Sequence, residues 1–184
     1  MKGLLKFITC GSVDDGKSTL IGHILYDSKL LYADQEKALE LDSKVGSREG
    51  KIDYSLLLDG LMAEREQGIT IDVAYRYFTT DNRSFIVADT PGHEDFSEDT
   101  YRTLMAADSA VMVIDASKGV EKQTIKLFKV CVLRHIPIFT FINKMDRDAN
   151  DTFDLLDDIE KELGIATCPI NWPIGSGKNF KGVY

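Results

Sequence analysis

The most constraining feature of the sequence is the segment GSVDDGKST at residues 11–19, which follows the apolar run LLKFITC at residues 4–10. It fits the pattern of a glycine, four residues, a second glycine, a lysine and a serine or threonine, which forms a phosphate-binding loop. In such a loop, backbone N–H groups turn inward around a phosphate, and the N-terminus of the next helix adds partial positive charge. A chance glycine turn is the alternative, but the strand-like run before it and the helix-like stretch after it disfavour that interpretation.

Each residue type in this loop has its own expected role. Glycine at positions 11 and 16 permits the tight backbone path and the close approach of a phosphate. The ammonium group of Lys17 can reach the β- and γ-phosphate oxygens, and the hydroxyl of Ser18 can bind Mg²⁺. We expect the nucleotide to contact Gly11, Val13, Asp14, Asp15, Gly16, Lys17, Ser18 and Thr19.

Strand-like and helix-like segments alternate along the rest of the chain. The apolar pattern predicts strands at residues 4–10, 71–79, 84–90, 109–116, 136–143 and 166–174, of which 71–79 and 84–90 form an antiparallel hairpin. It predicts helices at residues 17–31, 94–107, 121–134 and 150–163, with one or two surface helices across 33–46 and 53–67. The alternation predicts an α/β fold with a mostly parallel sheet and helices on both faces.

Composition narrows the class of protein further. The formal net charge of -8 presents no basic face, so direct sequence-specific binding of nucleic acid is not expected. No apolar stretch reaches the roughly 18 residues that span a membrane, and the first residues do not resemble a signal peptide. Three cysteines without metal-ligand spacing predict buried, reduced thiols, so we expect a cytoplasmic protein without a membrane partner.

A second motif, DTPGH at residues 89–93, ends a predicted strand, which is where a sensor of the γ-phosphate belongs. Asp89 can hold a Mg²⁺-bound water, and the N–H of Gly92 can point at the γ-phosphate. His93 is placed to orient an attacking water, the role that a glutamine has in some nucleotide hydrolases. A lone histidine is usually structural, and that interpretation is kept for His23 and His135.

A third motif, NKMD at residues 143–146, ends another predicted strand. The carboxylate of Asp146 can accept hydrogen bonds from two N–H groups of guanine, whereas adenine would leave buried polar groups unpaired. Asn143 can brace this loop, and the stem of Lys144 can lie along the base. The segment SGK should add a backbone N–H, that of Gly177, to the guanine carbonyl, so we also expect contacts from Ser176, Gly177 and Lys178. In this order the motifs predict GTP or GDP as the ligand.

With these motifs the chain resembles the translation-factor-like GTPases, and the stretch REQGITIDVAYRYF at residues 65–78 resembles their first switch. The resemblance implies that Thr70 binds Mg²⁺ and contacts the γ-phosphate. It implies that Val13 and Ile69 flank the catalytic histidine, and that Asp14 lies near a monovalent cation. It also implies that residues 1–184 form a single P-loop NTPase G domain, and the missing terminal helix suggests that this domain is truncated before its last helix.

The resemblance divides between two families. Up to about residue 93, stretches such as KFITCGSVDDGKSTLIGHILYDS resemble the large, GTPase subunit of sulfate adenylyltransferase. From about residue 94, stretches such as SAVMVIDASKGVEKQT and CPINWPIGSGKNFKGVY resemble the class II peptide chain release factor. We therefore expect a join near residues 89–95, either natural or engineered, against the alternative of one divergent family member.

These observations predict a GTPase with Mg²⁺ as cofactor and with His93, Lys17 and Thr70 as catalytic residues. The metal is expected on Ser18, Thr70 and Asp89. No arginine occupies a motif position, so intrinsic turnover should be slow until a partner accelerates it. The partner is either the sulfate adenylyltransferase small subunit or the ribosome with a class I release factor. The alternative is a chimeric or truncated, non-catalytic G domain that binds nucleotide weakly.

Overall fold

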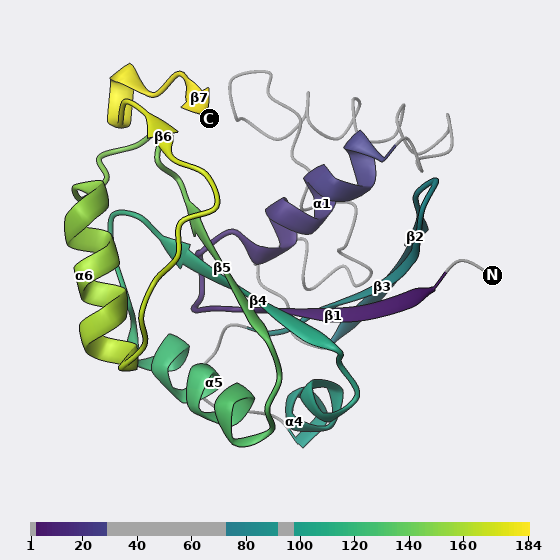
Figure 1. The fold of residues 1–184 in the computed structure, drawn as a ribbon. Helices are drawn as coiled ribbons and strands as arrows, with labels where there is room; N and C mark the ends of the chain where they lie inside the picture. Colours follow the sequence, from purple (N-terminus) through teal and green to yellow (C-terminus); the bar gives the residue numbers. More distant parts are fainter. Residues whose placement is uncertain (1–2, 29–72, 92–97) are drawn as a thin grey trace.

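The central sheet contains β1 (Leu4–Cys10), β2 (Ala74–Thr79), β3 (Ser84–Asp89), β4 (Ser109–Asp115) and β5 (Ile138–Asn143). The structure is a computed structural model that describes residues 3–28, 73–91 and 98–184 (Figure 1). The strand order is β2-β3-β1-β4-β5. β2 pairs antiparallel with β3, and the other neighbouring strands pair in parallel. The predicted hairpin and the mostly parallel sheet are therefore confirmed.

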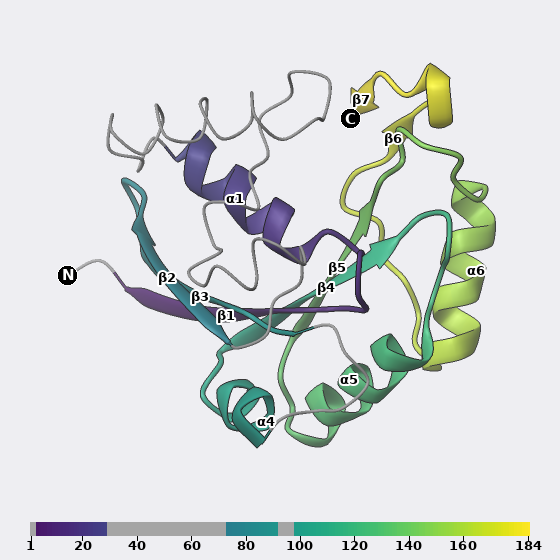
Figure 2. The same cartoon turned by 180° about the vertical axis from the view of Figure 1, so that it is seen from behind.

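Helices cover both faces of this sheet, as predicted. They are α1 (Lys17–Asp27), α4 (Glu98–Met105), α5 (Lys122–Leu133) and α6 (Thr152–Leu163). Figures 1 and 2 show α1 on one face, and α4 and α5 on the opposite face. One buried cluster joins Ile21 of α1 to Phe78 and Val87 of the hairpin. A larger cluster joins Leu127 of α5 to Ile8 of β1.

The first strand has apolar side chains on both faces because it lies inside the sheet. Successive side chains of a strand point to opposite faces. Phe7 accordingly packs against the cluster under α1, whereas Ile8 and Cys10 belong to the cluster under α5. Cys10 and Cys131 are buried, as predicted, but Cys168 is exposed and that part of the prediction is wrong.

Two predicted helices have different ends in the structure. The helix predicted over 17–31 ends at Asp27, and Ser28 forms its C-cap. The Ser28 N–H and hydroxyl both donate to the carbonyl of Ile24, at 3.1 and 2.6 Å. The helix predicted over 94–107 ends at Met105. The surface helices predicted across 33–46 and 53–67 lie outside the described residues.

The strand predicted over 166–174 is wrong. Only β6 (Pro173–Ile174) is a strand there, and it pairs with β7 (Gly182–Val183) in a separate two-stranded sheet. Two prolines in this stretch, Pro169 and Pro173, cannot donate a ladder hydrogen bond. Ile170 is 77% exposed, so the apolar residues of the segment do not enter the core. Among the described strands, β5 therefore forms one edge of the central sheet.

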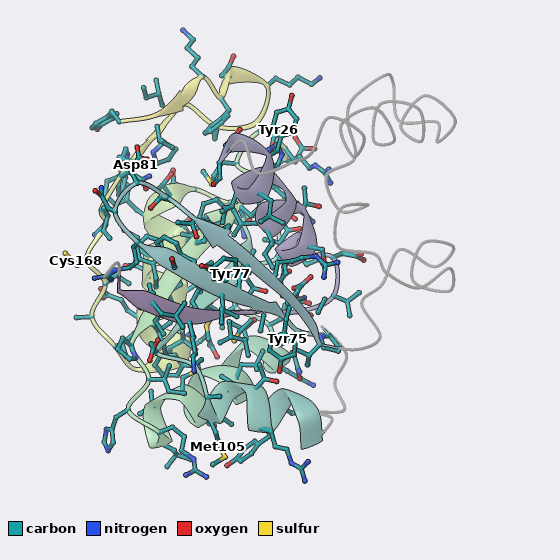
Figure 3. All side chains as sticks on the ribbon, turned by 90° about the vertical axis from the view of Figure 1, so that its right-hand side faces the viewer. Tyr26, Tyr75, Tyr77, Asp81, Met105 and Cys168 are labelled. Carbon is teal, nitrogen blue, oxygen red and sulfur yellow. The ribbon has the colours of Figure 1, made fainter. Side chains whose placement is uncertain are left out.

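The opposite edge of the described sheet is β2, where Tyr75 and Tyr77 lie on the exposed side (Figure 3) and Phe78 points into the core. Tyr75 is 56% exposed and Tyr77 is 64% exposed. The Tyr75 hydroxyl lies 2.8 Å from the hydroxyl of Thr103, which links the hairpin to α4.

None of the helices in the described ranges is long and apolar enough to cross a membrane.

Candidate functional site

The predicted phosphate loop lies between the end of β1 and the start of α1, and its two glycines cannot be replaced without conflict. Gly16 has φ of 90° and Gly11 has φ of 155°. A Cβ atom on Gly11 would lie 2.6 Å from the carbonyl oxygen of Val113, and one on Gly16 would lie 2.5 Å from the Asn143 side-chain nitrogen. The loop therefore packs closely against β4 and β5, as a loop that cradles a phosphate requires.

Lys17 is positioned inside this loop. It is the first residue of α1, is only 6% exposed, and donates from Nζ to the Ser12 carbonyl at 2.7 Å. Burial lowers the pKa of Lys17, while the nearby carboxylates Asp89 and Asp15 act in the opposite direction. A cation held this way beside the loop can meet phosphate oxygens without first being drawn out of solvent. Thr19, by contrast, is exposed in the first turn of α1.

Asp89 and Ser18 form the part of the predicted metal site that the structure describes. Asp89 ends β3, and its two carboxylate oxygens accept from the Thr9 hydroxyl at 2.9 Å and the Ser18 hydroxyl at 2.5 Å. Burial raises the pKa of Asp89, and the bonds from Ser18 and Thr9 and the charge of Lys17 oppose that shift. A hydroxyl and a carboxylate side by side are the hard oxygen donors that Mg²⁺ prefers, so these residues fit the ion.

The NKMD loop is tied directly to the phosphate loop. Asn143 donates from its side-chain nitrogen to the Asp15 carbonyl at 2.8 Å, and its Oδ1 accepts from the N–H of Lys144 at 2.9 Å. The Nζ of Lys144 donates to the carbonyl of Asp14. The structure thus joins two motifs whose bonded residues are 128 and 130 positions apart in the sequence. Asn143 braces the loop, as its position in the motif predicts.

The SGK segment also approaches the NKMD loop. The N–H of Gly177 donates to the carbonyl of Met145 at 2.8 Å. That N–H is therefore engaged within the protein, and the role of Gly177 at the guanine carbonyl stays a prediction. Asp146, Ser176 and Lys178 are next to the bonded residues in the sequence, and all three are exposed. The segment therefore lies next to the NKMD loop, and its contacts with the base stay predictions.

Four residues that the motifs predict fall in stretches that the structure does not describe. These residues are Ile69, Thr70, Gly92 and His93. Their roles at the γ-phosphate stay predictions.

Sequence reasoning did not identify Asp115, the last residue of β4. It is buried, and its Oδ2 accepts from the Nζ of Lys144 at 2.7 Å. Asp115 of β4 is paired with Asn143 of β5 in the register of the two parallel strands. Lys144 is the next residue after Asn143, so the pairing brings it close to Asp115. The available signal was an aspartate at the carboxyl end of an apolar strand, which is the edge where ligands bind in open α/β sheets.

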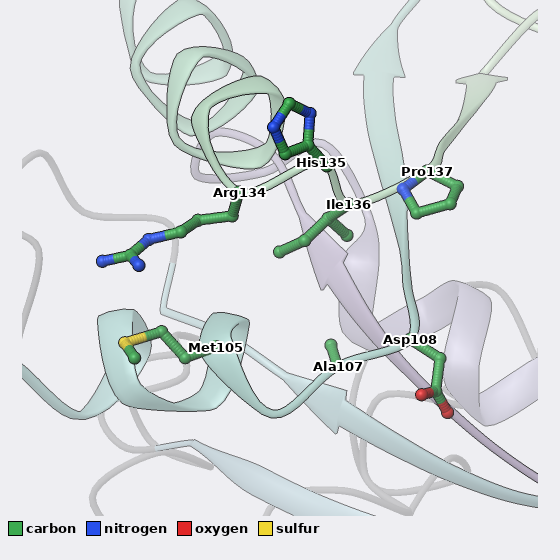
Figure 4. Close-up of a pocket in the computed structure, with 7 residues that line it drawn as sticks. All are labelled: Met105, Ala107, Asp108, Arg134, His135, Ile136 and Pro137. Atoms are coloured by element: carbon green, nitrogen blue, oxygen red, sulfur yellow. The ribbon is translucent and has the colours of Figure 1, made fainter.

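A cavity of about 200 Å³ lies at the other end of the sheet (Figure 4). Asp108 and Pro137, which precede β4 and β5, help to line it. It is therefore separate from the nucleotide motifs at the carboxyl ends of these strands. His135, which also lines it, follows α5 with φ of 56° and donates its N–H to the Val132 carbonyl at 3.0 Å. This helix-ending geometry agrees with the structural role predicted for His135.

The family of the chain follows from comparison with known proteins. The sequence matches the family model described as the elongation factor Tu GTP binding domain over residues 2–184. The chain belongs to this family. It is accordingly a GTPase domain of the translation-factor type that binds guanine nucleotide.

The curated relatives include release factors. The chain is 52% identical over 170 residues to peptide chain release factor 3 of Staphylococcus haemolyticus, and 51% identical over 170 residues to that of Staphylococcus aureus. Each match covers 92% of this chain but only 31% of the relative. The elongation factor Tu type domain thus spans less than a third of the length of these proteins.

A solved structure from Thermus thermophilus matches the fold with a TM-score of 0.78. The match covers 97% of this chain and 25% of that chain, at 21% sequence identity. At this identity the likeness supports the fold alone, and it agrees with the G domain architecture described above.

Proposed function

We propose that this domain hydrolyses GTP to GDP and phosphate as the switch of a peptide chain release factor that acts on the ribosome. The observation that carries the proposal is the direct bonding of Asn143 and Lys144 to the carbonyls of the phosphate loop. The phosphate loop and the NKMD loop are held together, so they can bind the phosphates and the base of one nucleotide at the same time. A site for phosphate alone would not need the second loop. The 170-residue match to release factor 3 supports the biological role.

Within this proposal, the described residues hold and neutralise the phosphates. Lys17 and the inward N–H groups of the loop would stabilise negative charge that develops on the transferring and leaving oxygens. Ser18 and Asp89 would hold Mg²⁺, which when bound neutralises charge on the β- and γ-phosphates. Asp146 would accept from the guanine edge and so exclude adenine.

The remaining roles rest on motif position. Thr70 would complete the metal site and contact the γ-phosphate, with the N–H of Gly92 beside it. His93 would orient the attacking water between Val13 and Ile69. A monovalent cation would lie near Asp14, which has φ of 66°.

The release-factor role is favoured over sulfate activation. A match of 170 residues in a chain of 184 must extend on both sides of residues 89–95, where the two resemblances meet. One family therefore accounts for the chain on both sides of that point, and the idea of a join gains no support from the relatives. The sulfate adenylyltransferase small subunit is kept as a test partner only.

Single-turnover hydrolysis of GTP tests the proposal. The isolated protein should hydrolyse GTP slowly, and ribosomes should accelerate it, because no motif arginine supplies the charge that activators commonly bring. Stimulation by the sulfate adenylyltransferase small subunit in place of ribosomes would overturn the release-factor role. Absence of GTP binding would support the non-catalytic alternative. Rapid unaided turnover that an Arg→Ala variant abolishes would contradict the expected dependence on a partner.

A further inference from the structure

Three consecutive carbonyls of the phosphate loop are each bound by a side chain from a neighbouring strand end. Lys118 donates to the carbonyl of Val13 at 3.4 Å, Lys144 donates to that of Asp14, and Asn143 donates to that of Asp15 at 2.8 Å. In a trans peptide the C=O and the N–H of the same unit point in opposite directions. Donors that hold the carbonyls on the outside of the loop therefore favour N–H groups that face the phosphate.

The central donor of this set is anchored by a buried carboxylate. Asp115 is 3% exposed, and its Oδ2 accepts from the Nζ of Lys144 at 2.7 Å. Its Oδ1 accepts from the N–H of Ser117 at 2.9 Å and from the hydroxyl of Ser117 at 2.7 Å. Both oxygens are thus used, and the carboxylate has a fixed orientation.

The electrostatics agree with a permanently charged anchor. Burial alone would raise the pKa of Asp115, but the hydrogen bonds from Lys144 and Ser117 outweigh it and lower the pKa to about 2. The backbone places the two partners together, since the N–H of Ala116 donates to the carbonyl of Asn143 at 2.9 Å. Lys144 has φ of 64°, which is uncommon for a residue with a side chain and turns the chain sharply at the end of β5.

We propose that Asp115 is a positioning residue of the nucleotide site, which holds Lys144 against the Asp14 carbonyl so that the phosphate loop and the NKMD loop bind guanine nucleotide as one rigid unit. The inference rests on the proposed function, because it concerns the same site. It assigns a role to the end of β4, which none of the recognised motifs covers. As a positioning residue, Asp115 would contact no nucleotide atom and would act only through Lys144.

The test compares the release rate of a fluorescent GDP analogue from four proteins: the wild type, Asp115→Asn, Lys144→Met and the double variant. Asp115→Asn should speed release about ten-fold, the cost of one hydrogen bond between charged groups. The double variant should release GDP no faster than Lys144→Met alone, because both substitutions break the same contact. Additive effects would overturn the proposal, since they would mean that Asp115 acts independently of Lys144.

Asp108→Asn is the matched control. Asp108 lies at the other end of β4, where its Oδ2 accepts from the N–H of Lys6 at 2.8 Å. This variant should release GDP at the wild-type rate. Asp115→Glu, which keeps the charge, should restore slow release in part. An effect of Asp108→Asn equal to that of Asp115→Asn would mean a general loss of stability and would overturn the positioning role.

A measurement on the wild type covers the case in which Asp115→Asn fails to fold. With GDP bound, the carboxyl carbon of Asp115, followed by NMR, should stay in its ionised form well below pH ~4, the ordinary range for an aspartate. A normal titration in that range would mean that the ion pair is absent from the bound state, and would overturn the proposal. Equal affinity of the wild type for GDP and ADP would instead count against the proposed function, so the two failures are distinguishable.

Discussion

Asp15 is the residue of the phosphate loop whose environment is least expected for a carboxylate. It is 1% exposed, and its Oδ2 accepts from the N–H of Ser12 at 2.6 Å. Its Oδ1 is buried without a hydrogen-bond partner in the described structure. Burial raises the pKa of Asp15 from 3.8 to about 6, against the opposing effects of the Ser12 N–H and Lys17. The loop therefore contains a charge that folding alone does not favour.

The Asp15→Asn variant should be more stable than the wild type at neutral pH, without nucleotide. A raised carboxyl pKa means that the folded state loses stability as pH rises from about 4 through about 6, and the full cost is present above that range. The gain should be on the order of 2 kcal/mol at about pH 7.5 and much smaller at about pH 4.5. Urea unfolding at both pH values measures it, and an equal gain at both would contradict the assignment.

Gly16→Ala should reduce GDP affinity by at least about ten-fold, because the new methyl group meets the Asn143 side chain that joins the two loops. Gly164→Ala is the matched control. Gly164 also has a positive φ, of 68°, but nothing lies within 4 Å of its Cβ position. The control should cost about 1 kcal/mol of folding stability and leave GDP affinity unchanged. If both variants lose the same GDP affinity, the cause is backbone strain at a positive φ and not the contact between residue 16 and Asn143.

At the scale of elements, α1 carries both the start of the site and part of the core. Lys17 and Ser18 are in its first turn, while Ile21 is fully buried one turn later beside Leu25. The helix has an N-cap in the left-handed conformation and no side-chain cap there. Its position therefore depends on packing against the β2–β3 hairpin, through Phe78 and Val87.

Ile21→Ala should lower the free energy of unfolding by about 3 kcal/mol, the typical cost of emptying a packed apolar site. Ile170→Ala removes the same atoms from a residue that is 77% exposed and should change stability by less than about 0.5 kcal/mol. Chemical denaturation of both variants measures the difference. Similar losses in the two proteins would mean that the cluster under α1 is not a packed core.

Some elements of the fold could be predicted from the sequence, and others could not. β1, the hairpin and α5 have strong apolar patterns, and their types were predictable from local signals alone. The 166–174 segment has a similar apolar content, but its two prolines and the absence of a pairing partner in the described sheet keep it exposed. The Asp115–Lys144 pair was not predictable in this way, because it depends on which strands are neighbours.

At the scale of the whole molecule, the described site is assembled from the ends of four strands. β1 leads into the phosphate loop, β3 supplies Asp89, β4 supplies Asp115 and β5 leads into Lys144. No strand contributes the site alone, so it forms only when the sheet is complete. Ligand binding and global stability are therefore coupled.

A saturating guanine nucleotide should therefore stabilise the whole fold. At about one hundred times its Kd, GDP should add about 2.7 kcal/mol to the free energy of unfolding. ADP at the same concentration should add little, because Asp146 would face an acceptor edge on adenine. Thermal unfolding with each nucleotide measures the difference. Equal shifts for the two would contradict the guanine assignment.

Among the described strands, β5 is an edge of the central sheet, and this has a consequence for the protein in concentrated solution. The strand reads IFTFIN, carries no charge and has Phe139 48% exposed. Unpaired edge strands of this kind can pair with the same edge of another molecule, and lysines, prolines or bulges usually prevent it. We expect slow, concentration-dependent aggregation on warming, which Phe139→Lys should suppress in light-scattering measurements. Solubility would then depend on an edge far in sequence from the phosphate loop.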